Sequence, residues 1–263
     1  MKRTLLTCFL AASLLACDDA TELDTVNTLG TDVQFSMTEY LEPGQRTLSF
    51  KFLTTESYPC INYRIASELR REGSDITVSL REVQGADVCL EALAPAVSFL
   101  DVGELPPGEY PFTVEVGTSI TNSGTLLVTE EAIELLMGPA EGFIVPTSRL
   151  LRVPEGVIWG SVQSSDKSGG AQTQVMQRLR RLGASAKVLP EGNYGYFVVD
   201  AGGNVTASSP TAAQDKVFVL GYRGEASNLK QLIDEVADAY DEQVSVSVRT
   251  SGGDEFRSGA RNW

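Results

Sequence analysis

Apolar and polar residues alternate in short runs through the first half of the chain, between Val33 and Glu131. A period of two places the apolar side chains on one face of a strand and the polar side chains on the other. Many short strands separated by turns are typical of an antiparallel β-sandwich, which we expect over residues 33–137. The seven predicted strands span residues 33–37, 47–53, 61–65, 76–80, 97–100, 112–116 and 125–128.

The pattern changes after a Gly138-Pro139 break, and residues 138–153 are interpreted as a linker. Between 154 and 250, apolar residues recur at helical spacing in two segments, and Ser227 or Asn228 is the expected N-cap of the second. Strands alternating with helices predict an α+β sandwich of ferredoxin-like character. The expected helices span 172–182 and 229–240, the strands span 157–162, 217–222 and 244–248, and a hairpin joins 186–189 to 194–199.

The N-terminus, residues 1–17, has the pattern of an export signal. After Met1-Lys2-Arg3 comes a mostly apolar, uncharged segment of twelve residues, 5–16, a run too short for a membrane-spanning helix, which takes roughly twenty. The ending Leu14-Leu15-Ala16-Cys17 resembles the lipobox of bacterial lipoproteins. That resemblance implies that Cys17 is acylated and becomes the first mature residue, followed by an acidic tether, residues 18–32. We therefore expect a protein anchored by lipid to the inner or outer membrane of a bacterial cell envelope, facing the periplasm or the exterior.

One turn in the first half carries a second resemblance. The stretch Leu105-Pro-Pro-Gly-Glu-Tyr-Pro111 resembles the turn between two late strands of immunoglobulin-like domains. The resemblance implies an immunoglobulin-like β-sandwich over residues 33–137. In it, the hydroxyl of Tyr110 would bond to nearby backbone and hold the corner.

The cysteines divide into two that belong to the N-terminal signal and two that remain. Cys8 leaves with the signal and Cys17 carries the lipid, which leaves Cys60 and Cys89. In an oxidising compartment such a pair is expected to form a disulfide, and two separate buried thiols are the alternative. Closing a loop of about thirty residues is worth roughly 3–4 kcal/mol on the loop-entropy model.

The chain has no histidine, which removes the usual general base near neutral pH and the commonest metal ligand. We therefore expect a protein that is not an enzyme, with a hydrolase built on two carboxylates as the alternative. No cofactor or metal is predicted, because the chain contains neither a Cys-x-x-Cys pair nor an Asp-x-Asp-x-Asp-Gly calcium loop. Calcium binding by the acidic first half is kept as an alternative.

Charge is distributed unevenly along the chain, whose net charge is −14. Residues 18–137 hold 6 basic and 21 acidic residues, whereas 138–263 hold 13 basic and 14 acidic residues. So acidic a protein is not expected to bind nucleic acid. The basic cluster Arg178, Arg180 and Arg181 is a candidate contact patch. It is either a solvated helix face or a surface that docks on the acidic first half or on an anionic envelope polymer.

Residues 252–256 read Gly-Gly-Asp-Glu-Phe, which resembles the signature of the diguanylate cyclases. In that family the signature lies on a turn followed by a further strand and several tens of residues. Here only a polar tail is expected, residues 251–263, and the family's upstream metal-binding aspartate and substrate-binding stretch have no match. We therefore interpret the string as chance and not as a cyclase site.

These observations predict a lipid-anchored binding or scaffold protein, with an envelope protein or a cell-wall polymer as its partner. Peptidoglycan binding is the nearest alternative. The predicted helix 172–182 and the following stretch 184–190 are similar in pattern to sporulation-related peptidoglycan-binding domains, and that resemblance implies recognition of the cell wall.

Overall fold

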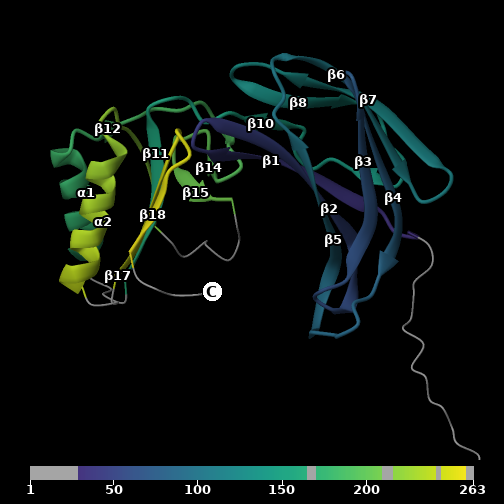
Figure 1. The fold of residues 1–263 in the computed structure, drawn as a ribbon, viewed down its shortest axis with the longest axis horizontal. Coiled ribbons are helices and arrows are strands. Elements are labelled where there is room, and N and C mark those ends of the chain that lie inside the picture. Colours follow the sequence, from purple (N-terminus) through teal and green to yellow (C-terminus); the bar gives the residue numbers. More distant parts are fainter. Residues whose placement is uncertain (1–28, 165–169, 209–215, 241–243, 259–263) are drawn as a thin grey trace, which may run out of the picture.

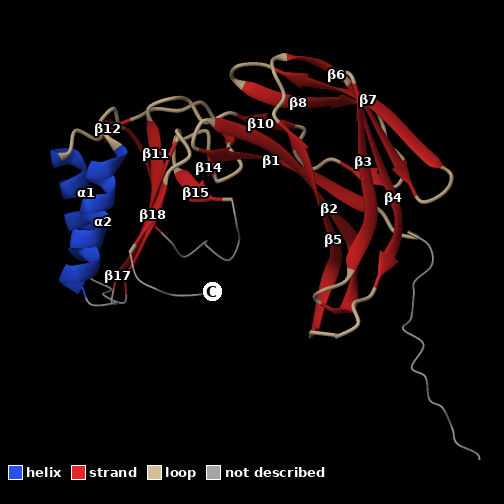
Figure 2. Cartoon of the chain, in the orientation of Figure 1, coloured by secondary structure: helices blue, strands red, loops and turns tan. Residues whose placement is uncertain are grey.

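The computed structural model describes residues 29–164, 170–208, 216–240 and 244–258. These residues form a mostly β structure with three sheets and two helices, and both helices lie in the second half (Figure 1, Figure 2). The predicted β-rich first half and the predicted change of pattern in the second half are therefore both observed.

The first half is one ten-stranded sheet in the order β10-β8-β7-β6-β4-β3-β5-β2-β1-β9. Most neighbours are antiparallel, but the pairs β1/β9, β3/β5 and β4/β6 are parallel, so the sheet is mixed and not purely antiparallel as expected. The strands are β1 Val33–Glu42, β2 Gln45–Cys60, β3 Arg64–Glu72, β4 Asp75–Gln84, β5 Glu91–Gly103, β6 Gly108–Val116, β7 Ile120–Val128, β8 Ala132–Met137, β9 Phe143–Ile144 and β10 Arg149–Leu151.

This sheet curls over its own apolar face. The ring of Phe35 on β1 lies 5.1 Å from that of Phe50 on the adjacent strand β2, and also 5.9 Å from that of Phe112 on β6. Four strands separate β1 from β6 in the sheet order, so these rings meet only because the sheet bends back on itself. The alternation read from the sequence supplies this core, because every second residue at the start of β1 is buried.

Residues 138–153, which the sequence pattern assigns to a linker, are built into the sheet. Phe143 on β9 pairs with Val33 on β1, and Leu150 on β10 pairs with Ile133 on β8. The two short strands therefore occupy opposite edges of the sheet. Both Phe143 and Leu150 are buried in its core, which explains why this stretch is part of the sheet and not a linker.

The second half is a five-stranded sheet in the order β12-β16-β11-β17-β18, and its neighbouring strands are antiparallel. Both helices cover the same face of this sheet (Figure 2). The elements are β11 Val157–Ser164, α1 Gly170–Arg181, β12 Ser185–Ala186, β16 Lys216–Gly221, α2 Ala226–Tyr240, β17 Val244–Thr250 and β18 Glu255–Arg257.

Both helices agree with the predicted periodicity. The buried stripe of α1 includes Val175 and Leu179, and that of α2 includes Leu229 and Val236. Helix α1 ends before Gly183, the expected stop, whose φ of +93° is one that side chains disfavour. Helix α2 begins earlier than expected, at Ala226, so Ser227 and Asn228 lie inside its first turn and not at the N-cap.

The predicted hairpin between 186–189 and 194–199 is wrong. Strand β12 pairs with β16 instead, and the backbone N–H of Tyr194 bonds to the carbonyl of Phe197 at 2.9 Å, so the chain turns where a continuous strand was expected. The residues on either side of this turn belong to a separate three-stranded sheet, made of β13 Gly192–Asn193, β14 Phe197–Val199 and β15 Val205–Ala207.

The other face of the five-stranded sheet is buried against the small sheet and the first half. Trp159 on β11 packs with Phe197 on β14 at a ring distance of 6.0 Å. The same buried cluster contains Leu151 of β10 and Ala132 of β8, with Leu41 of β1 packed against it. The two halves therefore share part of their apolar core, in addition to the covalent connection between them.

The predicted polar tail, residues 251–263, begins with regular structure. Strand β18 pairs with β17 through Phe256 opposite Val248 and Glu255 opposite Arg249. The sequence pattern missed this strand because only Phe256 among its three residues is apolar. Residues 259–263 lie outside the described residues.

Candidate functional site

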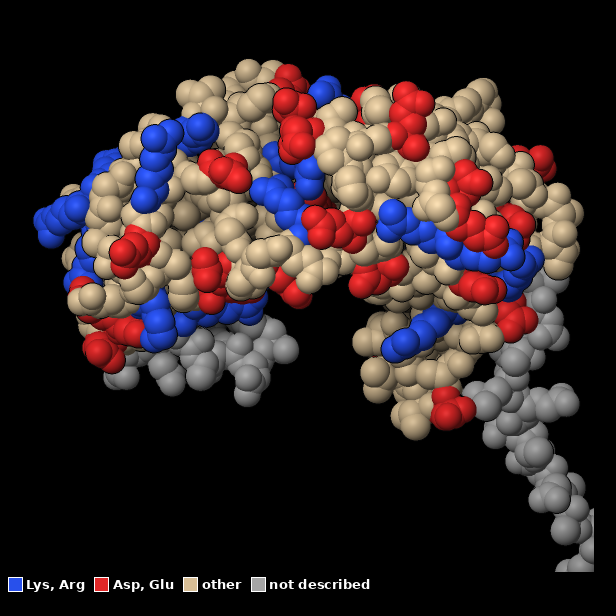
Figure 3. Space-filling view, turned by 45° about the horizontal axis from the view of Figure 1, so that its top comes forward, with Lys and Arg blue, Asp and Glu red and all other residues tan. Residues whose placement is uncertain are grey.

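A solvent-accessible cavity lies between the two helices. It is a groove of about 370 Å³ between the last turn of α1 and the first three turns of α2. Figure 3 shows Lys and Arg side chains gathered at the end of the molecule that carries the helices. The groove is lined by Arg178 and Arg181 from α1, by Leu182 directly after α1, and by Asn228, Gln231, Leu232 and Glu235 from α2.

The predicted basic cluster is divided by this geometry. Arg178 and Arg181 line the groove, because positions three apart share one face of a helix. Arg180 lies on the helix between them, is exposed, and does not line the groove. A patch of three arginines in the sequence is therefore two groove residues and one solvated neighbour.

Ion pairing distinguishes the two groove arginines. Arg178 is half-buried and pairs with Glu235 at 3.4 Å. Glu235 also accepts a hydrogen bond from the side-chain amide of Gln231 at 3.0 Å. Across the described ranges no carboxylate lies within ion-pair distance of Arg181. The groove therefore presents one guanidinium without a counter-ion.

The remaining lining groups suit an anionic ligand with an apolar part. A guanidinium binds a carboxylate or a phosphate through two parallel hydrogen bonds. Asn228 and Gln231 add side-chain amides, and Leu182 and Leu232 add apolar surface beside them. The groove can therefore bind a carboxylate or phosphate group on a carrier that is partly apolar.

A second cleft, of about 270 Å³, lies where the two halves meet. The hydroxyl of Tyr196 accepts a hydrogen bond from the backbone N–H of Leu41 at 3.1 Å, and the guanidinium of Arg249 lies 5.0 Å from the Tyr196 ring. Burial raises the pKa of Tyr196, and the bond from Leu41 and the charge of Arg249 oppose that rise. The cleft is lined by Tyr40, Leu41, Glu42, Trp159, Tyr196, Arg249, Thr250, Gly253, Asp254 and Glu255.

The string Gly252–Phe256 forms the turn at this cleft, and its residues have structural contacts. Gly253 has a φ of +95°, and a Cβ there would lie 2.1 Å from the carbonyl carbon of Glu42. Asp254 accepts a hydrogen bond from the Thr250 hydroxyl at 3.0 Å, and Phe256 packs against the core under the helices. The turn therefore packs closely against the end of β1.

Two of the three carboxylates in this cleft are already bonded to neighbouring side chains. Glu255 pairs with Arg249 at 2.9 Å and also with Arg257, while Asp254 is held by Thr250. Within the ranges that the structure describes, no group of three or more His, Cys, Asp or Glu side chains could hold a metal ion.

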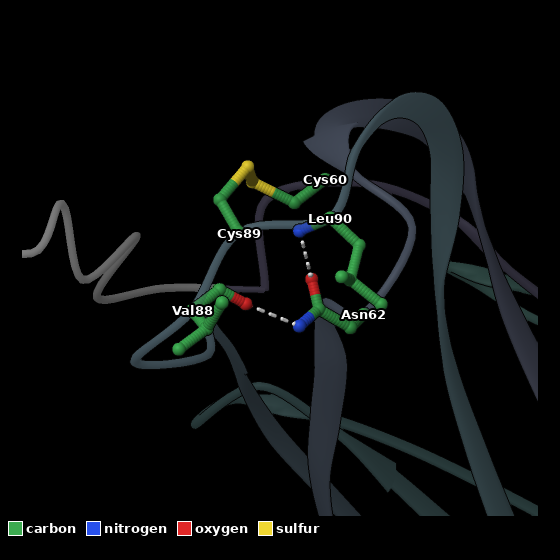
Figure 4. The surroundings of a disulfide bond; sticks show 5 residues. All are labelled: Cys60, Asn62, Val88, Cys89 and Leu90. Atoms are coloured by element: carbon green, nitrogen blue, oxygen red, sulfur yellow. Dashed lines mark hydrogen bonds between the residues drawn. A yellow bond between two sulfur atoms is a disulfide. The ribbon is translucent and has the colours of Figure 1, made fainter.

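Cys60 and Cys89 form the predicted disulfide, with their Cα atoms 5.3 Å apart (Figure 4). Beside it, the side chain of Asn62 donates to the carbonyl of Val88 at 2.6 Å and accepts from the N–H of Leu90 at 3.3 Å. The disulfide and these bonds fasten the loop before β5 to the turn after β2.

The Tyr110 hydroxyl donates to the carbonyl of Pro106 at 2.8 Å, the corner contact expected from the sequence. Sequence reasoning missed a second copy of this contact, in which the Tyr194 hydroxyl donates to the carbonyl of Pro190 at 3.0 Å. The signal is present in the chain: Leu-Pro-x-Gly-x-Tyr occurs at 105–110 and again at 189–194. In both copies the tyrosine holds the backbone four residues upstream.

Cys17 and the rest of the N-terminal signal lie outside the described residues. In the part of the chain that the structure does describe, neither helix is long and apolar enough to cross a membrane. Comparison with known proteins finds no family model, no curated protein and no solved structure that matches this chain.

Proposed function

We propose that this protein is an exported bacterial lipoprotein that acts, without catalysis, as a binding or scaffold module of the cell envelope. Its ligand face is the groove between α1 and α2. The observation that carries this proposal is the guanidinium of Arg181, which stands in an open groove with no carboxylate within ion-pair distance among the described residues. Export is supported by the disulfide Cys60–Cys89, since disulfides persist in oxidising compartments.

The finer fold assignment belongs to the same proposal. An immunoglobulin-like first half is supported by the Tyr110 corner contact. A ferredoxin-like second half is supported by the strand order β12-β16-β11-β17, in which α1 follows β11 and α2 connects β16 to β17. In this arrangement the first half stands between the lipid on Cys17 and the groove.

The partner is a separate molecule that carries acidic groups. Every described residue that lines the groove belongs to the second half, so the acidic first half does not fill it. The face of the sheet opposite the helices is buried, which leaves the helical layer as the accessible side. An acidic surface of an envelope protein, or an anionic polymer, fits these conditions.

The test is affinity capture of the lipidated full chain from cross-linked membranes, followed by identification of the captured molecules. We expect one dominant envelope component with the wild type, and its loss with Arg181→Gln. Arg180→Gln is the matched control, because Arg180 carries the same charge one position away and lies outside the groove. Equal capture by both variants would contradict the assignment of the groove as the ligand face.

Peptidoglycan binding is the second candidate. It is supported by the run β11–α1–β12, a strand–helix–strand unit with arginines in the last turn of its helix. Peptidoglycan is a carboxylate-bearing polymer, so it matches the chemistry of the groove. The test is sedimentation of the protein with purified sacculi at low salt, with Arg181→Gln and Arg180→Gln compared. The full chain is used because the halves share core residues, and absence of the wild type from the pellet eliminates this candidate.

A further inference from the structure

Four large aliphatic side chains are exposed together at the end of the first half that carries the disulfide. Their exposed fractions are 48% for Ile61, 70% for Val88, 53% for Leu90 and 80% for Leu93. Single exposed aliphatic residues are ordinary on protein surfaces, whereas a group of them marks an interaction site. We call these four residues the apolar tip. Figure 1 shows this end of β2 and β5 projecting from the body of the molecule, away from β8 and β10.

The backbone under the apolar tip is held firmly. The disulfide Cys60–Cys89 closes it, the N–H of Ile61 donates to the carbonyl of Leu90 at 3.0 Å, and Asn62 bonds both flanking segments (Figure 4). A preorganised surface loses little conformational entropy on binding. The fixed backbone therefore keeps the aliphatic side chains of the tip exposed to solvent.

The course of β1 relates this tip to the N-terminus. Val33, at the start of β1, lies opposite Thr54 of β2, and the strand then runs away from the tip toward Glu42. Thr54 precedes Cys60 by six residues, which corresponds to about 20 Å of strand. The sixteen residues from Cys17 to Val33 can span at most about 55 Å. A lipid on Cys17 can therefore reach a bilayer that also touches the tip.

We infer that the apolar tip docks on the surface of the bilayer that holds the lipid of Cys17, an inference that rests on the proposed lipid anchor. Aliphatic side chains bind at the boundary between headgroups and acyl chains. Asp87 lies next to Val88, Glu91 lies between Leu90 and Leu93, and both are exposed, so these two carboxylates limit the depth of insertion. Docking gives the anchored protein a defined orientation on the membrane.

The test places a tryptophan in the tip of the lipidated full chain. Val88→Trp and Leu93→Trp proteins are reconstituted into phosphatidylcholine vesicles with brominated acyl chains, which quench tryptophan only on close approach. Val188→Trp is the control, because Val188 is 91% exposed in the second half. We expect quenching at 88 and 93 that is several-fold stronger than at 188. Absence of quenching at both tip positions would overturn the inference. A tip that binds a protein partner and not the bilayer would give this result.

Flotation of the same vesicles separates the two proposals. Protein that floats without quenching at the tip retains its anchor and lacks the docking. Protein that does not float has no lipid anchor, and both proposals then fail. In phosphatidylglycerol vesicles, repulsion of the acidic first half should weaken tip quenching at low salt. Added salt should restore it, because the Debye length falls to about 10 Å at 0.1 M. Quenching that declines with salt would indicate electrostatic attachment and contradict apolar docking.

Discussion

The carboxylate of Glu39 lies 2.8 Å from the guanidinium of Arg152, a residue 113 positions later in the chain. Both side chains are nearly buried, with exposed fractions of 8% and 12%. A second guanidinium, that of Arg46, contacts the other oxygen of the same carboxylate at 3.0 Å. Arg46 also donates to the carbonyl of Val153, and Arg152 to that of Thr129. One carboxylate thus ties β1 to the segment that leads into the second half.

Removal of the Glu39 charge should be strongly destabilising. Glu39→Gln leaves two arginines close together without their counter-ion, and breaking a buried ion pair from one side costs about 3–5 kcal/mol. Urea unfolding measures the loss. The control is Glu72→Gln, whose exposed pair with Arg70 at 3.6 Å should contribute less than about 1 kcal/mol. Similar losses in the two variants would show that burial does not set the strength of the Glu39 cluster.

Gly253→Ala should disrupt the contact between the last turn and β1. Alanine is strained at a φ of +95°, and its Cβ would overlap the Glu42 carbonyl, so we expect a loss of at least about 2 kcal/mol. Gly252→Ala is the matched control, because the nearest atom to its Cβ lies 3.5 Å away. Thermal unfolding of both variants compares them. A larger loss of stability for Gly252→Ala than for Gly253→Ala would show that the close contact between Gly253 and Glu42 does not explain the need for glycine in this turn.

Stability should fall at alkaline pH as buried tyrosines ionise. Burial raises the pKa of Tyr196 above its ordinary value of 10.0, so the folded state holds this proton more tightly than the unfolded state. The resulting stabilisation is fully present below about pH 10 and is lost as pH rises through the folded-state pKa. Urea midpoints measured across this range, with Tyr196→Phe for comparison, report the effect. The stability of Tyr196→Phe should decline less steeply with pH than that of the wild type. Identical pH profiles for the two proteins would contradict this prediction.

The disulfide should contribute to stability and hold the apolar tip. Its sequence separation is 29 residues, and opening such a loop is expected to cost roughly 3–4 kcal/mol. The double variant Cys60→Ala/Cys89→Ala, unfolded in urea without reductant, measures this. In the wild type, peptide mapping without reductant should recover the two cysteines in one linked pair, and alkylation of both in native protein would refute the bridge.

Lipid attachment should depend on Cys17 alone. In cells labelled with a fatty acid, the wild type should incorporate the label and Cys17→Ser should not. Cys8→Ser is the control, because Cys8 lies within the proposed signal and should not alter acylation of the later cysteine. Label retained by Cys17→Ser would remove the lipobox interpretation and the anchor with it.

Much of the secondary structure was determined by local pattern. The stripes that include Val175 and Leu229 predict α1 and α2 because a period of 3.6 is a property of one segment, whatever it packs against. The alternation from Val33 onward predicts β1 in the same way. The corner contact of Tyr110 was also local, since its acceptor lies four residues upstream.

Tertiary structure decided which segments pair and which side chains meet. Phe143 and Leu150 sit in stretches too short for a periodic signal, and they become strands only because two sheet edges accept them. Only glycine fits at position 253 because the carbonyl group of Glu42, more than two hundred positions earlier in the chain, lies where a Cβ would be. Helical spacing places Arg178 and Arg181 on one face of α1, but only the position of α2 decides that this face lines a groove. Contacts between distant segments depend on the relative placement of whole elements, and a pattern read within one element does not contain that information.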